Sequence, residues 1–174
     1  MTRQIPVLDG WWSGGDDPAL LGHRCTTCQT ITFPFRRITC PNPECEGDEF
    51  DTVELSRVGT IWSYTDARYQ PPPPYVGVGQ DDFVPFAQAA VELGPEALVI
   101  LGQVAAGYTV DQLEVGMKVE LVVEPLYVDD ASGDERTTYR WRPVGIEAAT
   151  EAPPLPRLAA DPAATAAPAG TSGP

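Results

Sequence analysis

Four cysteines, all between residues 25 and 45, constrain the fold of this chain more than any other feature. They form two pairs, Cys25-Thr-Thr-Cys28 and Cys40-Pro-Asn-Pro-Glu-Cys45. Two close thiolates, a short loop and two further thiolates are the arrangement with which a chain surrounds one tetrahedral zinc ion. Four thiolates leave no open coordination position, so we expect a structural ion held by Cys25, Cys28, Cys40 and Cys45. Removing it should unfold this part of the chain.

Two other uses of the cysteines stay open. Disulfides belong to oxidising compartments, and a redox Cys-x-x-Cys site leaves the second pair without a role. The first residues contain no apolar signal core, and no apolar run approaches the ~20 residues of a membrane span. We therefore expect a cytoplasmic protein that does not bind membranes. The single histidine, His23, is expected to be solvated or to lie beside the ligands rather than to serve as a fifth ligand.

The rest of the ordered chain has the pattern of a mainly β protein. The 19 prolines and 16 glycines argue against long helices. Alternating apolar residues predict five strands, and Thr109 to Gln112 has the spacing of a capping box, with Gly116 placed to end one short helix. Five strands with one helix suit an OB-fold barrel better than a sandwich, which usually has seven strands. The expected strands cover 53–64 (with a bulge or bend at Gly59), 86–93, 98–104, 119–123 (closed by Pro125) and 139–141.

The two ends of the chain differ from this pattern. Leu8 shares a helical face with Trp11 or Trp12, and Gly14-Gly15 would stop a helix, so residues 1–20 are expected to form a short helical segment. The tryptophans either cover a small core or dock on a partner. Residues 148–174 are mostly Ala, Pro, Gly, Ser and Thr, which predicts a disordered tail with only Leu155 and Leu158 resting on a neighbour. The expected organisation is 1–20 helical, 21–50 zinc ribbon, 51–147 OB-fold and 148–174 tail.

Charge and composition exclude several function classes. The net charge is −14, and between residues 81 and 135 there are twelve acids against Lys118 alone, which opposes binding to a phosphate backbone. The chain contains no Gly-x-Ser-x-Gly, no Gly-x-Gly-x-x-Gly and no phosphate-loop signature, and we identify no catalytic residues. Arg24, Arg36 and Arg37 are candidates for contact with an isolated phosphate group or an acidic patch.

A proline-rich segment separates the first two expected barrel strands. Pro71 to Pro74 favour a stiff extended rod, and Tyr69 and Tyr75 flank it. The segment is either a spacer or a surface, including Pro72, Pro73 and Tyr75, that lies against another molecule.

Taken together, these features resemble a known family of acyl-CoA-associated proteins built from a rubredoxin-like zinc ribbon followed by an OB-fold. The resemblance covers roughly residues 8 to 126. Its residues are Trp11-Trp12, the two cysteine pairs, Phe33-Pro34, Pro71 to Tyr75, Ile100 to Val104 and Leu113 to Glu120. The chain departs from the family in its longer second cysteine gap and in an apparent insertion at residues 76–83.

The resemblance implies a non-catalytic accessory subunit of a thiolase-superfamily enzyme, in a two-plus-two assembly. Such subunits support carbon–carbon bond cleavage or formation on CoA thioesters, including retro-aldol shortening of steroid side chains. Leu8, Trp11, Trp12 and the 71–75 rod would then contact the partner. Arg24, Arg36 and Arg37 would face CoA or the partner's acids.

Two other functions stay open. The first is a module that binds single-stranded nucleic acid through stacked Trp62, Tyr64, Tyr139 and Trp141. The second is a free-standing enzyme that acts on CoA thioesters.

Overall fold

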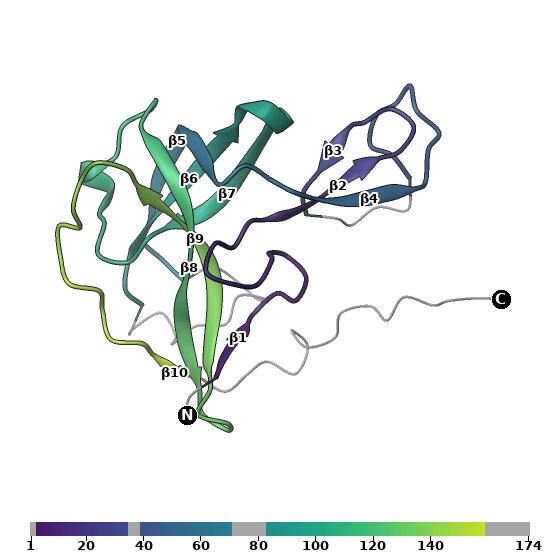
Figure 1. Ribbon diagram of the computed structural model, residues 1–174. Helices are drawn as coiled ribbons and strands as arrows, with labels where there is room; N and C mark the ends of the chain where they lie inside the picture. The colour runs from purple at the N-terminus through teal and green to yellow at the C-terminus, as the bar shows by residue number, and fades with distance from the viewer. Residues whose placement is uncertain (1–2, 35–38, 71–82, 159–174) are drawn as a thin grey trace.

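The computed structural model describes residues 3–34, 39–70 and 83–158, which form a small ribbon sheet projecting from a barrel (Figure 1). A seven-stranded sheet has the order β1-β9-β7-β6-β5-β8-β10, and a three-stranded sheet has the order β3-β2-β4. The strands are β1 (Gln4–Pro6), β2 (Leu21–Cys25), β3 (Ile31–Thr32), β4 (Phe50–Glu54), β5 (Val58–Ala67), β6 (Phe86–Leu93), β7 (Leu98–Val104), β8 (Lys118–Asp129), β9 (Glu135–Pro143) and β10 (Arg157–Leu158). Two single 3-10 turns, η1 (Gly94–Glu96) and η2 (Val110–Gln112), lie between strands.

Pairing between β8 and β9 closes five strands of the larger sheet into a barrel. The ring runs β5-β6-β7-β9-β8, and β8 pairs again with β5. All these pairs are antiparallel except β7 with β9. The mainly β class and the predicted five-stranded OB-fold are therefore confirmed. Alternate residues of each strand fill the interior, which contains Ile61, Val91, Leu93, Val119, Leu121 and Trp141, each at most 1% exposed.

Three local predictions within the barrel need correction. The capping box predicted at Thr109 and Gln112 is confirmed, and the Thr109 N–H donates to Gln112 Oε1 at 3.1 Å. The helix is only the 3-10 turn η2, however, and it ends before Gly116. Pro125 does not end its strand, because a register shift between Pro125 and Tyr127 accommodates the missing N–H and β8 continues to Asp129. Gly59 pairs regularly with Val119, and the bulge of β5 lies instead between Ile61 and Ser63.

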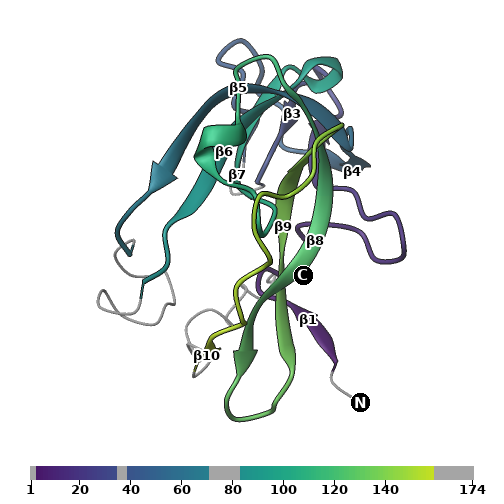
Figure 2. The same ribbon diagram turned by 90° about the vertical axis from the view of Figure 1, so that its left-hand side faces the viewer.

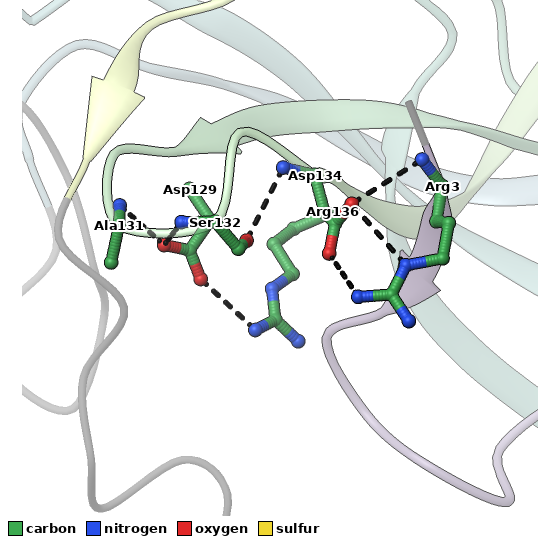
Figure 3. A network of polar contacts seen from close by, with 6 residues as sticks. All are labelled: Arg3, Asp129, Ala131, Ser132, Asp134 and Arg136. Atoms are coloured by element: carbon green, nitrogen blue, oxygen red, sulfur yellow. Dashed lines mark hydrogen bonds and ion pairs between the residues drawn. The ribbon is translucent and has the colours of Figure 1, made fainter. Parts of the chain in front are cut away.

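Beyond the barrel, β8 and β9 continue as a long hairpin (Figure 2). β1 pairs in parallel with β9 along one edge, and β10 pairs in parallel with β8 along the other. At its tip, Asp129 accepts a hydrogen bond from Arg136 at 3.0 Å, and Asp134 accepts one from Arg3 at 2.8 Å (Figure 3). Both carboxylates are buried, so these contacts hold the tip together and attach the N-terminal segment to it.

The helical segment expected over residues 1–20 is wrong for residues 3–20, which contain β1 and an isolated bridge between Trp12 and Leu20 but no helix. The Leu21 N–H donates to the Trp11 carbonyl at 2.8 Å, and Gly10 has a φ of +74°. Two helical turns could not offset their own ordering cost. Packing of the Trp11 and Trp12 rings against the barrel core determines the backbone conformation of this segment instead.

The disordered tail is also wrong for residues 148–158. The Thr150 N–H donates to the Gly107 carbonyl at 3.1 Å, and the Val128 N–H donates to the Pro156 carbonyl at 2.9 Å. Leu158 of β10 pairs with Asp129 of β8, which confirms the predicted contact of that leucine with a neighbour. Residues 159–174 lie outside the described residues.

Candidate metal centre

The first cysteine pair lies on a tight turn at the end of β2. The Gln29 N–H donates to the Cys25 carbonyl at 3.0 Å, and the Cys25 N–H donates to the Thr30 carbonyl at 2.9 Å. Gln29 has a φ of +64°, which reverses the chain into β3. Two residues between the cysteines are enough for this turn, so both thiols point to the same side.

The second pair uses its two additional residues to build a different turn. The Cys45 N–H donates to the Asn42 carbonyl at 3.0 Å, and the Asn42 side chain accepts from the Glu44 N–H at 3.0 Å. Asn favours such turns because its side chain replaces a backbone acceptor. The Cys40 N–H donates to the Gly47 carbonyl at 2.8 Å, which brings the ends of the loop together. The longer gap therefore lengthens the loop but keeps Cys45 beside the other thiols.

The four sulfur atoms converge at a single point. The Sγ atoms of Cys25 and Cys45 lie 3.8 Å apart, those of Cys28 and Cys40 lie 3.5 Å apart, and all four lie within 4.8 Å of one another. Zinc–sulfur bonds of about 2.3 Å place the sulfurs of a tetrahedral site about 3.8 Å apart. All four cysteines are free of disulfides. The four sulfur donors and their spacing fit one zinc ion. They fill all four tetrahedral positions, so none is open to substrate.

The surroundings of the thiols are those of a ligand set that needs a cation. Hydrogen bonds from the Thr30 side chain and backbone lower the pKa of Cys28 to about 6. Burial raises the pKa of Cys40 to about 12. A bound divalent cation favours the thiolate form of every ligand and displaces the protons that remain. Gly47 allows the two turns to approach, since a Cβ there would lie 2.9 Å from Cys25 Sγ and 2.8 Å from Thr27 Oγ1.

His23 and Arg24 lie on β2, next to the cysteines but outside their cluster. His23 Nε2 is 3.5 Å from Thr52 Oγ1, and no histidine joins the sulfur set within the described ranges. Arg24 stands opposite Asp51 of β4. Arg36 and Arg37 lie outside the described residues.

The residues predicted to bind a partner are placed only in part. Leu8, Trp11 and Trp12 are described and none is fully buried, whereas Pro72, Pro73 and Tyr75 lie outside the described residues. Both tryptophans pack on the core, so the structure shows the core-covering role that the sequence left open. Trp11 also lines a pocket of about 190 Å³ with His23, Phe33 and Pro34.

Tyr139 is the residue that the sequence did not single out for this region. Its ring contacts those of Trp11, Trp12, Phe33 and Trp141, and its hydroxyl donates to the Leu101 carbonyl at 2.7 Å. The strand predicted over 139–141 includes Tyr139 but does not predict these contacts. Tyr139 and Trp141 are 9% and 0% exposed, so they do not offer stacking faces to nucleic acid.

Comparison with known proteins agrees with the ribbon and the barrel. The family model of the ChsH2 rubredoxin-like zinc ribbon domain matches residues 12–51, and that of the ChsH2 C-terminal OB-fold domain matches residues 52–124. The chain belongs to the ChsH2 family. The order of the two matched domains is the order of the ribbon and the barrel in the structure.

Two curated proteins and one solved structure are similar in sequence to this ChsH2-family chain. A DUF35 domain-containing scaffold protein of Methanocaldococcus jannaschii is 29% identical over 83% of this chain and 95% of its own length. The benzoylsuccinyl-CoA thiolase subunit BbsA of Geobacter metallireducens is 31% identical over 67% of this chain and 69% of its own length. A solved structure titled Ltp2-ChsH2(DUF35) aldolase superposes with a TM-score of 0.52 at 30% identity, covering 72% of this chain and 84% of that one.

No helix in the described part of the chain is long and apolar enough to cross a membrane.

Proposed function

We propose that this chain is a non-catalytic accessory subunit that binds a thiolase-superfamily enzyme and supports carbon–carbon bond cleavage or formation on acyl-CoA thioesters. The observation that carries the proposal is family membership together with the relatives' names. BbsA is named as a subunit of a CoA thiolase, and the solved relative belongs to an aldolase. In this account the chemistry belongs to the partner, and this chain completes the assembly.

Zinc has a structural role in this proposal. Cys25, Cys28, Cys40 and Cys45 would hold one ion, which supplies cross-linking of the two turns and no reaction step. The ribbon sheet alone has only β2, β3 and β4, and few of its residues are buried. An ion that fixes both turns therefore stabilises a part of the molecule with little core of its own.

We further propose retro-aldol cleavage in steroid side-chain degradation as the reaction supported, in a cytoplasmic two-plus-two assembly. The four free thiols agree with a reducing compartment. The partner-facing residues are Leu8, Trp11, Trp12, Pro72, Pro73 and Tyr75. Arg24, Arg36 and Arg37 are the candidates for contact with CoA.

Co-expression with a candidate thiolase-superfamily enzyme from the same organism tests the proposal. Affinity purification through a tag on the enzyme, followed by size exclusion, should give a single peak that contains both chains in equal amounts. Separate elution of the two proteins at micromolar concentration would contradict the accessory role. Steroid acyl-CoA and a thiolysis substrate, offered to the purified assembly, distinguish aldol cleavage from thiolysis.

A further inference from the structure

An apolar row crosses the outer face of the barrel on three neighbouring strands and one loop. On β5, Trp62 occupies the extra position of the bulge and is 63% exposed. Ala90 of β6 pairs with Leu101 of β7, which is 59% exposed. On the other side of β5, the Gly116 N–H donates to the Ile61 carbonyl at 2.8 Å, which places Val115, 69% exposed, beside the bulge. We call Val115, Trp62, Ala90 and Leu101 the barrel row.

The bulge is what places Trp62 on this surface. Ile61, one residue before it, is 1% exposed and fills the barrel, and Ser63 after it pairs with the outward-facing Ala90. Bulges are frequent where a strand must re-aim a side chain for binding. Single exposed apolar residues need no explanation, but a large aromatic aligned with two exposed aliphatic side chains marks an interaction surface.

Polar residues border the barrel row on both sides. On one side, Thr60 pairs with Glu92 of β6 and with Lys118 of β8. Glu92 pairs with Val99, whose 51% exposed side chain extends the apolar surface along β7. On the opposite side, Gln88 pairs with Gln103. An apolar centre within a polar rim is the anatomy of a protein–protein interface. In Figure 1, β5, β6 and β7 lie next to one another in the upper part of the barrel.

Charge identifies the kind of occupant. Glu92 pairs with Thr60 beside the row, Glu114 directly precedes Val115, and both glutamates are exposed. Lys118 is the single lysine of a chain whose net charge is −14. Two copies of the chain brought face to face repel each other, and a phosphate backbone is repelled in the same way. A protein surface with an apolar centre and basic side chains around it is complementary to the row.

We propose that the barrel row docks the thiolase-type partner through an apolar patch surrounded by arginine or lysine side chains. The inference rests on the proposed function and adds the surface of this chain that the partner covers. Trp62 is its central anchor, and Leu101 and Val115 extend the contact across the barrel. Glu92 and Glu114 face the partner's basic residues.

Binding of the purified full-length chain to the thiolase-superfamily enzyme used in the co-expression experiment tests the barrel row. Trp62→Ser and Leu101→Ser should each raise Kd by about 30-fold, the effect of truncating a central interface residue. Val144→Ser is the matched control, because Val144 is 47% exposed and lies outside the row, and it should change Kd less than threefold. Zinc content and circular dichroism should match the wild type in all three variants.

The outcomes separate the two proposals. Wild-type binding that Trp62→Ser and Leu101→Ser leave within threefold overturns the barrel row but keeps the accessory function. Absence of wild-type binding overturns both. Glu92→Lys should weaken binding as well, and tighter binding would contradict a basic partner surface.

Sedimentation and an oligonucleotide titration test whether a second copy of the chain or single-stranded DNA covers the barrel row instead. The wild-type chain alone should sediment as a monomer and should not bind single-stranded DNA at low salt. A dimer that Trp62→Ser dissociates would show that a second copy covers the row. DNA binding that the same variant abolishes would show a nucleic-acid surface. Either result overturns the proposal.

Discussion

The ring of Tyr139 stacks on that of Trp11, with 6.5 Å between the ring centroids and 29° between the planes. Phe33 packs edge-on against both rings, at 5.2 Å from Trp11 and 6.2 Å from Tyr139. These three residues come from the N-terminal segment, the loop after β3 and the barrel strand β9. The aromatic cluster therefore fixes the ribbon against the barrel, and no single element of the fold could do so alone.

Trp11→Ala should lower the free energy of unfolding by about 2 kcal/mol, because a half-buried indole leaves the aromatic cluster. Trp62→Ala is the matched control, since the same side chain is removed from an exposed position, and it should change stability by less than about 0.5 kcal/mol. Urea unfolding followed by circular dichroism measures both. Equal losses would contradict the placement of the two tryptophans.

Cys40→Ser should abolish zinc binding and unfold the ribbon while the barrel stays folded. Cys40 is buried among the other sulfurs, and removing one of four ligands from a closed site leaves the remaining thiols without their cross-link. Metal analysis and amide hydrogen exchange over residues 21–54 measure the two effects. His23→Gln, next to the site but outside the sulfur cluster, should retain one zinc per chain. Loss of zinc from that control would make His23 a ligand.

The free energy of unfolding should fall at acidic pH because Asp129 and Asp134 at the hairpin tip become protonated. The Arg136 hydrogen bond lowers the pKa of Asp129, and the Arg3 hydrogen bond lowers that of Asp134. A folded-state pKa below the unfolded value of about 3.9 gives stability that is complete above that value and is lost as pH falls through the folded pKa. Urea midpoints between pH 6 and pH 3 should therefore decline less in Asp129→Asn than in Asp130→Asn. The same acid dependence in both variants would contradict this assignment.

Gly59→Ala should destabilise the barrel by about 2 kcal/mol through overpacking. A Cβ at Gly59 would contact Val91 Cγ1 and would lie 2.7 Å from the backbone carbonyl oxygen of Glu92. Gly94→Ala is the control, because a Cβ there meets nothing within 4 Å. Thermal unfolding of the two variants compares them. A Gly59→Ala protein as stable as the wild type would show that β5 and β6 are further apart than the structure places them.

Local sequence patterns predicted the parts of the fold that depend on near neighbours. The alternation over 86–93 gave β6 with its bounds, since one face of that strand packs inside the barrel and the other faces outward. The spacing of Cys25 and Cys28 predicted a turn that two residues suffice to form. In both cases the pattern and the structure that it encodes lie within ten residues of each other.

Contacts between distant residues decided the parts that the sequence did not predict. Leu8 and Trp12 have helical spacing, but packing of Trp12 on Tyr139, more than a hundred residues away, determines the conformation of the segment. The composition of residues 148–158 carries no sign of a strand, yet Arg157 and Leu158 pair with β8 because that edge of the hairpin is open to them. The bulge at Trp62 likewise has no local signal, because it depends on the register of β6.

Reconstitution of the reaction tests the accessory role most directly. The thiolase-superfamily enzyme used for co-expression, this zinc-loaded chain and a mixture of the two are each supplied with acyl-CoA substrate, and product is measured by mass spectrometry. The account predicts no turnover by this chain alone and turnover by the mixture well above that of the enzyme alone. Product formed by the purified chain without any partner would contradict it.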